Sequence, residues 1–115
     1  TEPFRSRPKG ALVVAASAKI EDGVTLEGPC FIDEEVVVKT GARIGAYTVL
    51  GRKCEVGNNA NIETSILWPS CAIGEQASLS DVVLGQGCYI APNAVVSEVT
   101  LGDKTVVPDP SRTAD

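Results

Sequence analysis

Histidine and methionine are absent from this sequence, and aromatic residues are scarce, with two Phe, two Tyr and one Trp. Histidine is the side chain that titrates near neutral pH, so it is the commonest general base and metal ligand. Its absence argues against imidazole-based acid–base catalysis and against zinc sites that use imidazole. With so few rings, the core must be built from stacked aliphatic and small side chains.

Long hydrophobic runs and basic clusters are also missing. No apolar stretch approaches the ~20 residues that cross a bilayer, and the first residues show no signal-peptide pattern. The formal net charge of −5 disfavours nucleic acids and anionic membranes as partners. At 115 residues the chain is expected to form one domain with no nucleic-acid and no membrane partner.

An aliphatic residue recurs at nearly every sixth position. Steps of six from Val14 reach Val, Ile or Leu each time as far as Ile62, and one step in every three then shortens to five. The first-face positions are Val14, Ile32, Leu50, Leu67, Leu84 and Leu101, the second-face positions are Ile20, Val38, Val56, Ile73, Ile90 and Val107, and the third-face positions are Leu26, Ile44, Ile62, Leu79 and Val96. This period predicts short strands joined by corners, with three hexads in each triangular coil.

The predicted fold is therefore all-β, a single-stranded parallel β-helix of hexapeptide repeats with nearly six triangular coils. It is expected over residues 12–107, with residues 1–11 as a linker or N-terminal cap and residues 108–115 as a C-terminal tail. The position after the aliphatic residue is often glycine, which is expected to supply backbone angles that a Cβ disfavours at a corner. These glycines are Gly45, Gly51, Gly57, Gly74, Gly85 and Gly102.

The residue two positions before each aliphatic residue is small or apolar, and it points to the same side of the strand. All four cysteines occupy this inward position: Cys30, and Cys54, Cys71 and Cys88 on successive coils of the second face. We expect buried, unpaired thiols, because stacked parallel strands hold Cβ atoms farther apart than the ~3.8 Å of a disulfide. A zinc site is not expected either, because a column spreads the cysteine sulfurs along a line, whereas zinc needs ligands that converge on one point. Unpaired thiols favour a reducing compartment, the cytoplasm.

The residue just before each aliphatic residue points outward, and on the first face these residues form an apolar stripe. A contiguous exposed apolar strip usually marks a contact surface. The predicted contact face consists of Val13, Phe31, Val49, Ile66 and Val83, together with Trp68, which stands at a corner where adjacent coils have Gly51 and Gly85. The alternatives are ordinary β-propensity on a solvated sheet and cover by residues 1–11.

No catalytic, cofactor-binding or metal-binding residue is predicted in this chain. Carboxylates near the corners are expected to be solvated surface groups rather than an acid–base pair; examples are Glu21, Glu27, Glu63 and Asp81. The spacing of the glycines follows the corners, and no G-x-x-x-x-G-K-[ST] phosphate loop occurs.

Two resemblances extend this interpretation. The hexad from Ile44 to Val49 resembles the repeat of the left-handed β-helix superfamily, and the left-handed sense is implied by that resemblance alone. The stretches EGPCFIDEE, IGAYTVLG and IETSILWPSCAIGEQASLSDVVLGQGCYI, with their shortened coils, resemble the C-terminal β-helix of sugar-nucleotide pyrophosphorylases. These nucleotidyltransferases join a nucleoside triphosphate to a sugar 1-phosphate. The resemblance covers about residues 11–107.

The resemblance implies a structural, oligomerisation and regulatory domain in nucleotide-sugar biosynthesis, acting as a homo-oligomer or docked to a catalytic domain. The catalytic domain of that family is absent from this chain, so no catalytic residue and no cofactor is carried over, and the chain alone is not expected to be an enzyme. A free-standing scaffold, or a subunit of an assembly such as a translation-initiation exchange factor, is an alternative. A further alternative is a hexapeptide acyltransferase with an unusual base between subunits.

Overall fold

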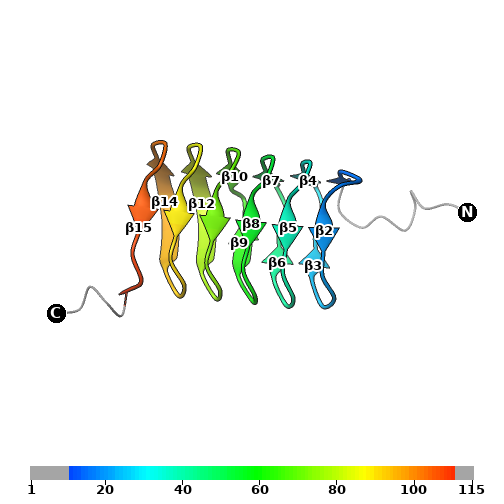
Figure 1. The fold of residues 1–115 in the computed structure, drawn as a ribbon, viewed down its shortest axis with the longest axis horizontal. Helices are drawn as coiled ribbons and strands as arrows, with labels where there is room; N and C mark the ends of the chain where they lie inside the picture. Colours follow the sequence, from blue (N-terminus) through cyan, green and yellow to red (C-terminus); the bar gives the residue numbers. More distant parts are fainter. Residues whose placement is uncertain (1–10, 111–115) are drawn as a thin grey trace, which may run out of the picture.

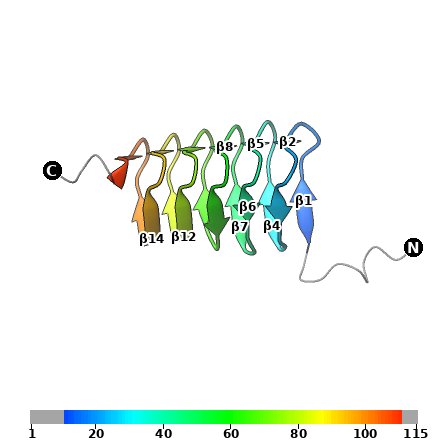
Figure 2. The same ribbon diagram turned by 90° about the horizontal axis from the view of Figure 1, so that it is seen from below.

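The computed structural model describes residues 11–110, which wind as a parallel β-helix of stacked triangular coils (Figure 1). The coils follow one another along a single axis, and the same succession is visible from below (Figure 2). The predicted all-β fold with nearly six coils is confirmed. Strand structure begins at Leu12 and ends at Val107. Residues 1–10 and 111–115, which include most of the predicted linker and tail, lie outside the described residues.

Each face of the prism is a ladder of short parallel strands. The first face consists of β1 (Leu12–Val14), β4 (Cys30–Ile32), β7 (Thr48–Leu50), β10 (Ile66–Leu67) and the second halves of β12 (Ser78–Leu84) and β14 (Val95–Leu101). The second face consists of β2 (Lys19–Ile20), β5 (Val37–Val38), β8 (Glu55–Val56), β11 (Ala72–Ile73), β13 (Tyr89–Ile90) and β15 (Val106–Val107). The third face consists of β3 (Thr25–Leu26), β6 (Arg43–Ile44), β9 (Asn61–Glu63) and the first halves of β12 and β14.

The strand register confirms the stacking that the six-residue period predicts. Leu67 pairs with Leu50 on one side and with Leu84 on the other. On the second face Ile73 pairs with both Val56 and Ile90. Because every aliphatic residue lies above another, each coil extends the same three hydrophobic columns.

The enclosed columns form one continuous core in the middle coils. Its largest buried side chains are Ile32, Ile44, Leu50, Ile62, Leu67, Leu79, Leu84 and Ile90. The inward residues of the end coils are an exception to the prediction, since Leu12 is 45% exposed, Val14 39% and Val99 37%. They belong to end coils, where a neighbouring coil is lacking on one side, so the column is open there.

The role expected for the glycines after the aliphatic positions is wrong. None of these six glycines has a positive φ; the left-handed conformation falls two residues later, on Gly87 at one corner and on non-glycine residues such as Lys53, Asn59 and Gln76 at the others. Five of the six, all but Gly102, are required by the spacing of the coils instead. A Cβ on Gly51 would lie 2.7 Å from the Leu67 carbonyl oxygen, and a Cβ on Gly74 would lie 2.4 Å from the Pro92 nitrogen.

Each shortened step removes one corner residue, and at the second and third of these steps the strand continues through the corner. β12 and β14 each run across such a corner as one seven-residue strand. The turn is made by single residues with positive φ, Asp81 at 58° and Glu98 at 54°. The first and third faces are thereby joined into one sheet, whereas the second face forms a sheet of its own.

Ser65 stabilises the first shortened corner. Its hydroxyl is buried; it donates to the Glu63 carbonyl oxygen at 2.8 Å and accepts from the Val82 backbone N–H of the next coil at 3.1 Å. An apolar residue at this position would leave a buried N–H group without a partner.

Replacing Ser65 with Ala is therefore expected to lower the free energy of unfolding by about 1–3 kcal/mol. Urea unfolding followed by circular dichroism measures this change. Thr48→Val is the matched control, because its equally buried hydroxyl makes only one long contact, 3.5 Å to the Ala46 carbonyl oxygen. Equal losses in both variants would show that the bridge from Ser65 to Val82 contributes nothing.

Candidate functional site

The outward residues of the first face lie above one another in register. Val13 pairs with Phe31, Phe31 with Val49, and Ile66 with both Val49 and Val83. Each is held outward because its neighbours along the strand are the inward core residues. Val13, Phe31 and Ile66 are 48%, 40% and 45% exposed, and Val49 and Val83 are half-buried. The structure thus brings five of the six predicted contact residues into one stripe.

An open depression of about 420 Å³ lies along the N-terminal half of this stripe. Val13, Phe31, Val49 and Ile66 line it, together with Pro29, Tyr47 and the edge of Cys30. Tyr47, which is not among the predicted contact residues, occupies the corner before β7 with a positive φ and a 69% exposed side chain. Its place beside the stripe follows from the corner geometry, which the six-residue period does not specify.

Trp68 lies at the opposite corner of the first face, directly after β10. Its side chain is 55% exposed, while its backbone N–H donates to the Leu84 carbonyl oxygen of the next coil. The backbone of Trp68 is therefore fixed to the next coil, whereas its side chain is largely exposed. It extends the apolar surface around the edge of the prism but does not line the depression.

The predicted column of buried thiols is confirmed, and it has an ordered hydrogen-bond pattern. The thiols of Cys54, Cys71 and Cys88 donate to the carbonyl oxygens of corner residues Trp68, Gly85 and Gly102 at 3.2, 3.1 and 3.1 Å. All four cysteines are unpaired and buried. The side-chain contact with Cys54 and burial both raise the pKa of Cys71, and burial raises the pKa of Cys30. The Cys71 thiol therefore holds its corner to the next coil in the neutral form, whereas the side-chain contact with Cys71 lowers the pKa of Cys54.

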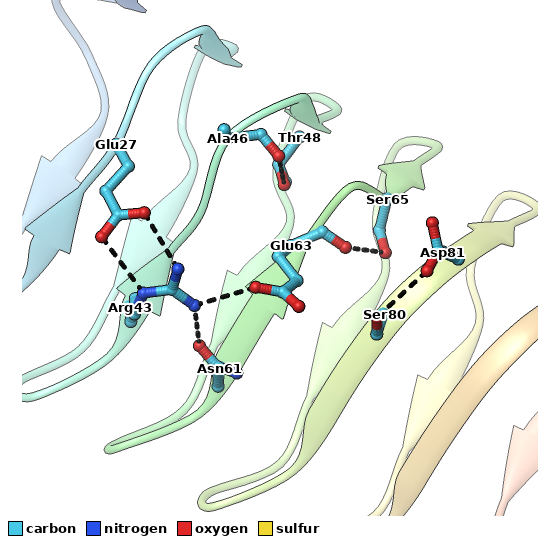
Figure 3. Close-up of polar contacts among 9 residues, drawn as sticks. All are labelled: Glu27, Arg43, Ala46, Thr48, Asn61, Glu63, Ser65, Ser80 and Asp81. Carbon is cyan, nitrogen blue, oxygen red and sulfur yellow. Dashed lines mark hydrogen bonds and ion pairs between the residues drawn. The ribbon is translucent and has the colours of Figure 1, made fainter. Parts of the chain in front are cut away.

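Three of the four carboxylates that the sequence places near corners contact an adjacent coil. On the third face the Arg43 guanidinium bridges Glu27 at 2.9 Å and Glu63 at 3.2 Å, and it also donates to the Asn61 side-chain oxygen at 2.7 Å (Figure 3). These hydrogen bonds raise the pKa of Arg43, the contact with Glu27 contributing most. The cluster ties three successive coils together on a surface that is only partly shielded from water, where such pairs stabilise weakly.

The remaining two carboxylates also have local partners. Glu21 accepts hydrogen bonds from the backbone and hydroxyl of Thr40 at 2.9 and 3.0 Å. Asp81 accepts one from the Ser80 hydroxyl at 3.2 Å, as Figure 3 shows. Within residues 11–110 there is no group of three Cys, Asp or Glu side chains able to hold a metal ion. In the same range no helix is long and apolar enough to cross a membrane.

Solved structures share this fold. A histidine-to-asparagine mutant of perosamine N-acetyltransferase from Caulobacter crescentus, in complex with CoA and GDP-perosamine, matches with a TM-score of 0.80 and 22% identity over 85% of this chain and 49% of that chain. The acetyltransferase domain of PglB from Neisseria gonorrhoeae matches with a TM-score of 0.79 and 14% identity over 84% of this chain and 48% of that chain. This chain spans about half the length of either protein, and identities this low indicate the fold alone.

The sequence itself matches a family. Comparison with curated proteins gives no match, but residues 26–112 match the family described as the GMPPB C-terminal domain. That range contains all the shortened coils, the thiol column and most of the apolar stripe. This chain therefore belongs to the GMPPB C-terminal domain family, the C-terminal β-helices of sugar nucleotidyltransferases.

Proposed function

We propose that this β-helix is the assembly and regulatory domain of a sugar-1-phosphate nucleotidyltransferase, and that its first face binds a second copy or the catalytic domain. The observation that carries the proposal is the in-register apolar stripe with its depression of about 420 Å³. An exposed apolar strip that is continuous over successive coils is typical of a contact surface. Family membership supplies the nucleotidyltransferase context.

The contrast between faces supports the choice of surface. The third face presents Arg43, Asn61 and Ser78 outward, and its charges are already paired with one another. The first face offers no such pairing over most of its length, and large apolar side chains stay in contact with water. Covering them would be favourable at roughly 25 cal/mol for each Å² of apolar surface.

The four unpaired thiols fit a reducing compartment, so we propose a cytoplasmic location.

Replacing both Ile66 and Val83 with Lys is expected to weaken self-association or domain docking by at least about tenfold, a loss of about 1.4 kcal/mol or more, without changing the fold. Two buried ammonium groups would have to be desolvated at the interface, whereas in the free domain they remain in water. Analytical ultracentrifugation of the chain, and of the full gene product, measures the change in assembly.

The control places the same charges on the polar face, as Thr25→Lys with Ser78→Lys. Both residues point outward from the third face. This control is expected to assemble like the parent. An unchanged mass for the first-face variant would remove the proposed interface.

The acyltransferase alternative has the fold likeness to two acetyltransferases in its favour. Against it, the chain contains no histidine to act as base. Turnover of acetyl-CoA by the purified chain would support it.

The reading frame upstream of Thr1 separates the nucleotidyltransferase domain from a free-standing scaffold. A nucleotide-binding catalytic domain encoded there is expected for the nucleotidyltransferase domain.

A further inference from the structure

A second hollow, of about 300 Å³, lies on the second face, away from the apolar stripe. It arises from side-chain size on the outward ladder. Ala72 pairs with Glu55 on one side and with Tyr89 on the other, so a methyl group stands between two long side chains. The adjoining corner positions Gly57 and Gly74 add no side chains, and the hollow therefore extends to the edge of the face.

Three of the four polar residues that line this hollow carry side-chain acceptors, and one aromatic residue lies beside them. Glu55, Glu75 and Asn58 line it with Tyr89, which is 42% exposed. The amide nitrogen of Asn58 donates to the Thr40 carbonyl oxygen at 3.3 Å, so its oxygen is the atom left to accept. The backbone N–H groups of Gly57 and Gly74 already donate to the carbonyl oxygens of Ile73 and Ile90.

The charge of the hollow is unbalanced. Within the part of the chain that the structure describes, neither Glu55 nor Glu75 takes part in an ion pair, in contrast to Glu27, Glu35 and Glu63. Lys39 is the single cationic residue among the lining residues, against two glutamates. A ligand that fits must therefore be cationic, rich in donors and able to stack on an aromatic ring.

We propose that the hollow bounded by Glu55, Glu75 and Tyr89 binds a guanidinium group, supplied by an arginine side chain of a partner protein. Guanidinium has five N–H donors and no acceptor, matches carboxylates in a fork and stacks on tyrosine rings. An ammonium group lacks the planar face and the fork. The hollow is on a different face from the apolar stripe, so this inference does not depend on the proposed assembly contact.

The experiment is a titration of the ¹⁵N-labelled chain with blocked Gly-Arg-Gly, blocked Gly-citrulline-Gly and free arginine, followed by amide chemical shifts. Citrulline has nearly the same shape as arginine but is neutral. The arginine peptide is expected to shift the amides around Ala72 and Tyr89 saturably, with an affinity on the order of millimolar for a single side chain. Citrulline is expected to bind at least about tenfold more weakly.

Three variants test the location. Ala72→Leu fills the hollow from an outward position and is expected to abolish binding, and Glu55→Gln with Glu75→Gln is expected to weaken it at least about tenfold. Asp22→Asn with Glu98→Gln, which removes the same two charges at exposed positions outside the hollow, is expected to bind like the parent. Thermal melting verifies that each variant is folded.

Equal binding of citrulline and arginine peptides, or unchanged binding by the Ala72→Leu variant, would overturn the guanidinium site. Free arginine binding more than tenfold tighter than the peptide would overturn the protein partner, since it would indicate a free metabolite as the ligand.

Discussion

Replacing Cys71 with Asp is expected to lower the free energy of unfolding by several kcal/mol, on the order of 4 kcal/mol. Cys71 is 1% exposed and lies in the middle of the thiol column, between the coils that carry Cys54 and Cys88. A carboxylate there would lose its hydration and gain no cation in exchange. The thiol that it replaces is neutral and donates to the Gly85 carbonyl oxygen.

The loss of stability caused by Cys71→Asp is expected to increase as the pH rises. Burial will raise the pKa of the introduced carboxyl above its ordinary value of about 3.9, so the folded chain will keep a proton that the unfolded chain releases. The defect is therefore expected to be smallest near pH 4 and to grow as the pH rises toward 7. Urea unfolding at both pH values measures it.

Ser70→Asp is the matched control for this substitution. It adds the same charge one residue earlier, at an exposed corner with a positive φ that Asp tolerates. Its stability is expected to stay within about 0.5 kcal/mol of the parent. A Cys71→Asp variant as stable as this control would mean that the column faces solvent.

Replacing Gly74 with Ala is expected to cost on the order of 3 kcal/mol, although the substitution adds one carbon atom. The added Cβ would lie 2.4 Å from the Pro92 nitrogen and 2.7 Å from the Ala91 carbonyl carbon. Both are backbone atoms of the next coil, held in place by the strand ladder, so neither can move aside without breaking pairs between β11 and β13. Thermal and urea unfolding measure the loss.

Gly102→Ala provides the comparison within the same molecule. Gly102 occupies the equivalent position after its aliphatic residue, but no atom lies within 4 Å of its Cβ position, because it belongs to the last coil. Its φ is not positive, so alanine is expected to be neutral or to stabilise by up to about 1 kcal/mol through the unfolded chain. Equal costs at the two positions would contradict the account based on coil spacing.

The candidate sites differ in how far the sequence could reveal them. The outward stripe from Val13 to Val83 follows from alternation along the strands, so its members could be named in advance. Tyr47 and the hollow beside Ala72 could not, because both depend on how corners and neighbouring coils lie in space. A small residue between two large ones on a ladder becomes visible once the pairing of Ala72 with Glu55 and Tyr89 is known.

The glycine positions illustrate the same division. The six-residue pattern identified Gly51 and Gly74 as positions that need glycine. It attributed this need to backbone angles, whereas the cause is close contact with the next coil. Their backbone angles are ordinary for L-residues, and the left-handed conformation falls on residues such as Lys53 and Gln76, whose side chains give no sign of it.

By itself the sequence determined the coil, its three-sided register and the inward columns, because a strict six-residue period repeats the same local geometry and allows one way of stacking aliphatic residues. The tertiary structure alone decided which glycines are indispensable, which end residues remain exposed and where the surface is hollow. Those features depend on distances between residues 17 or 18 positions apart, which become neighbours when the coils close on one another.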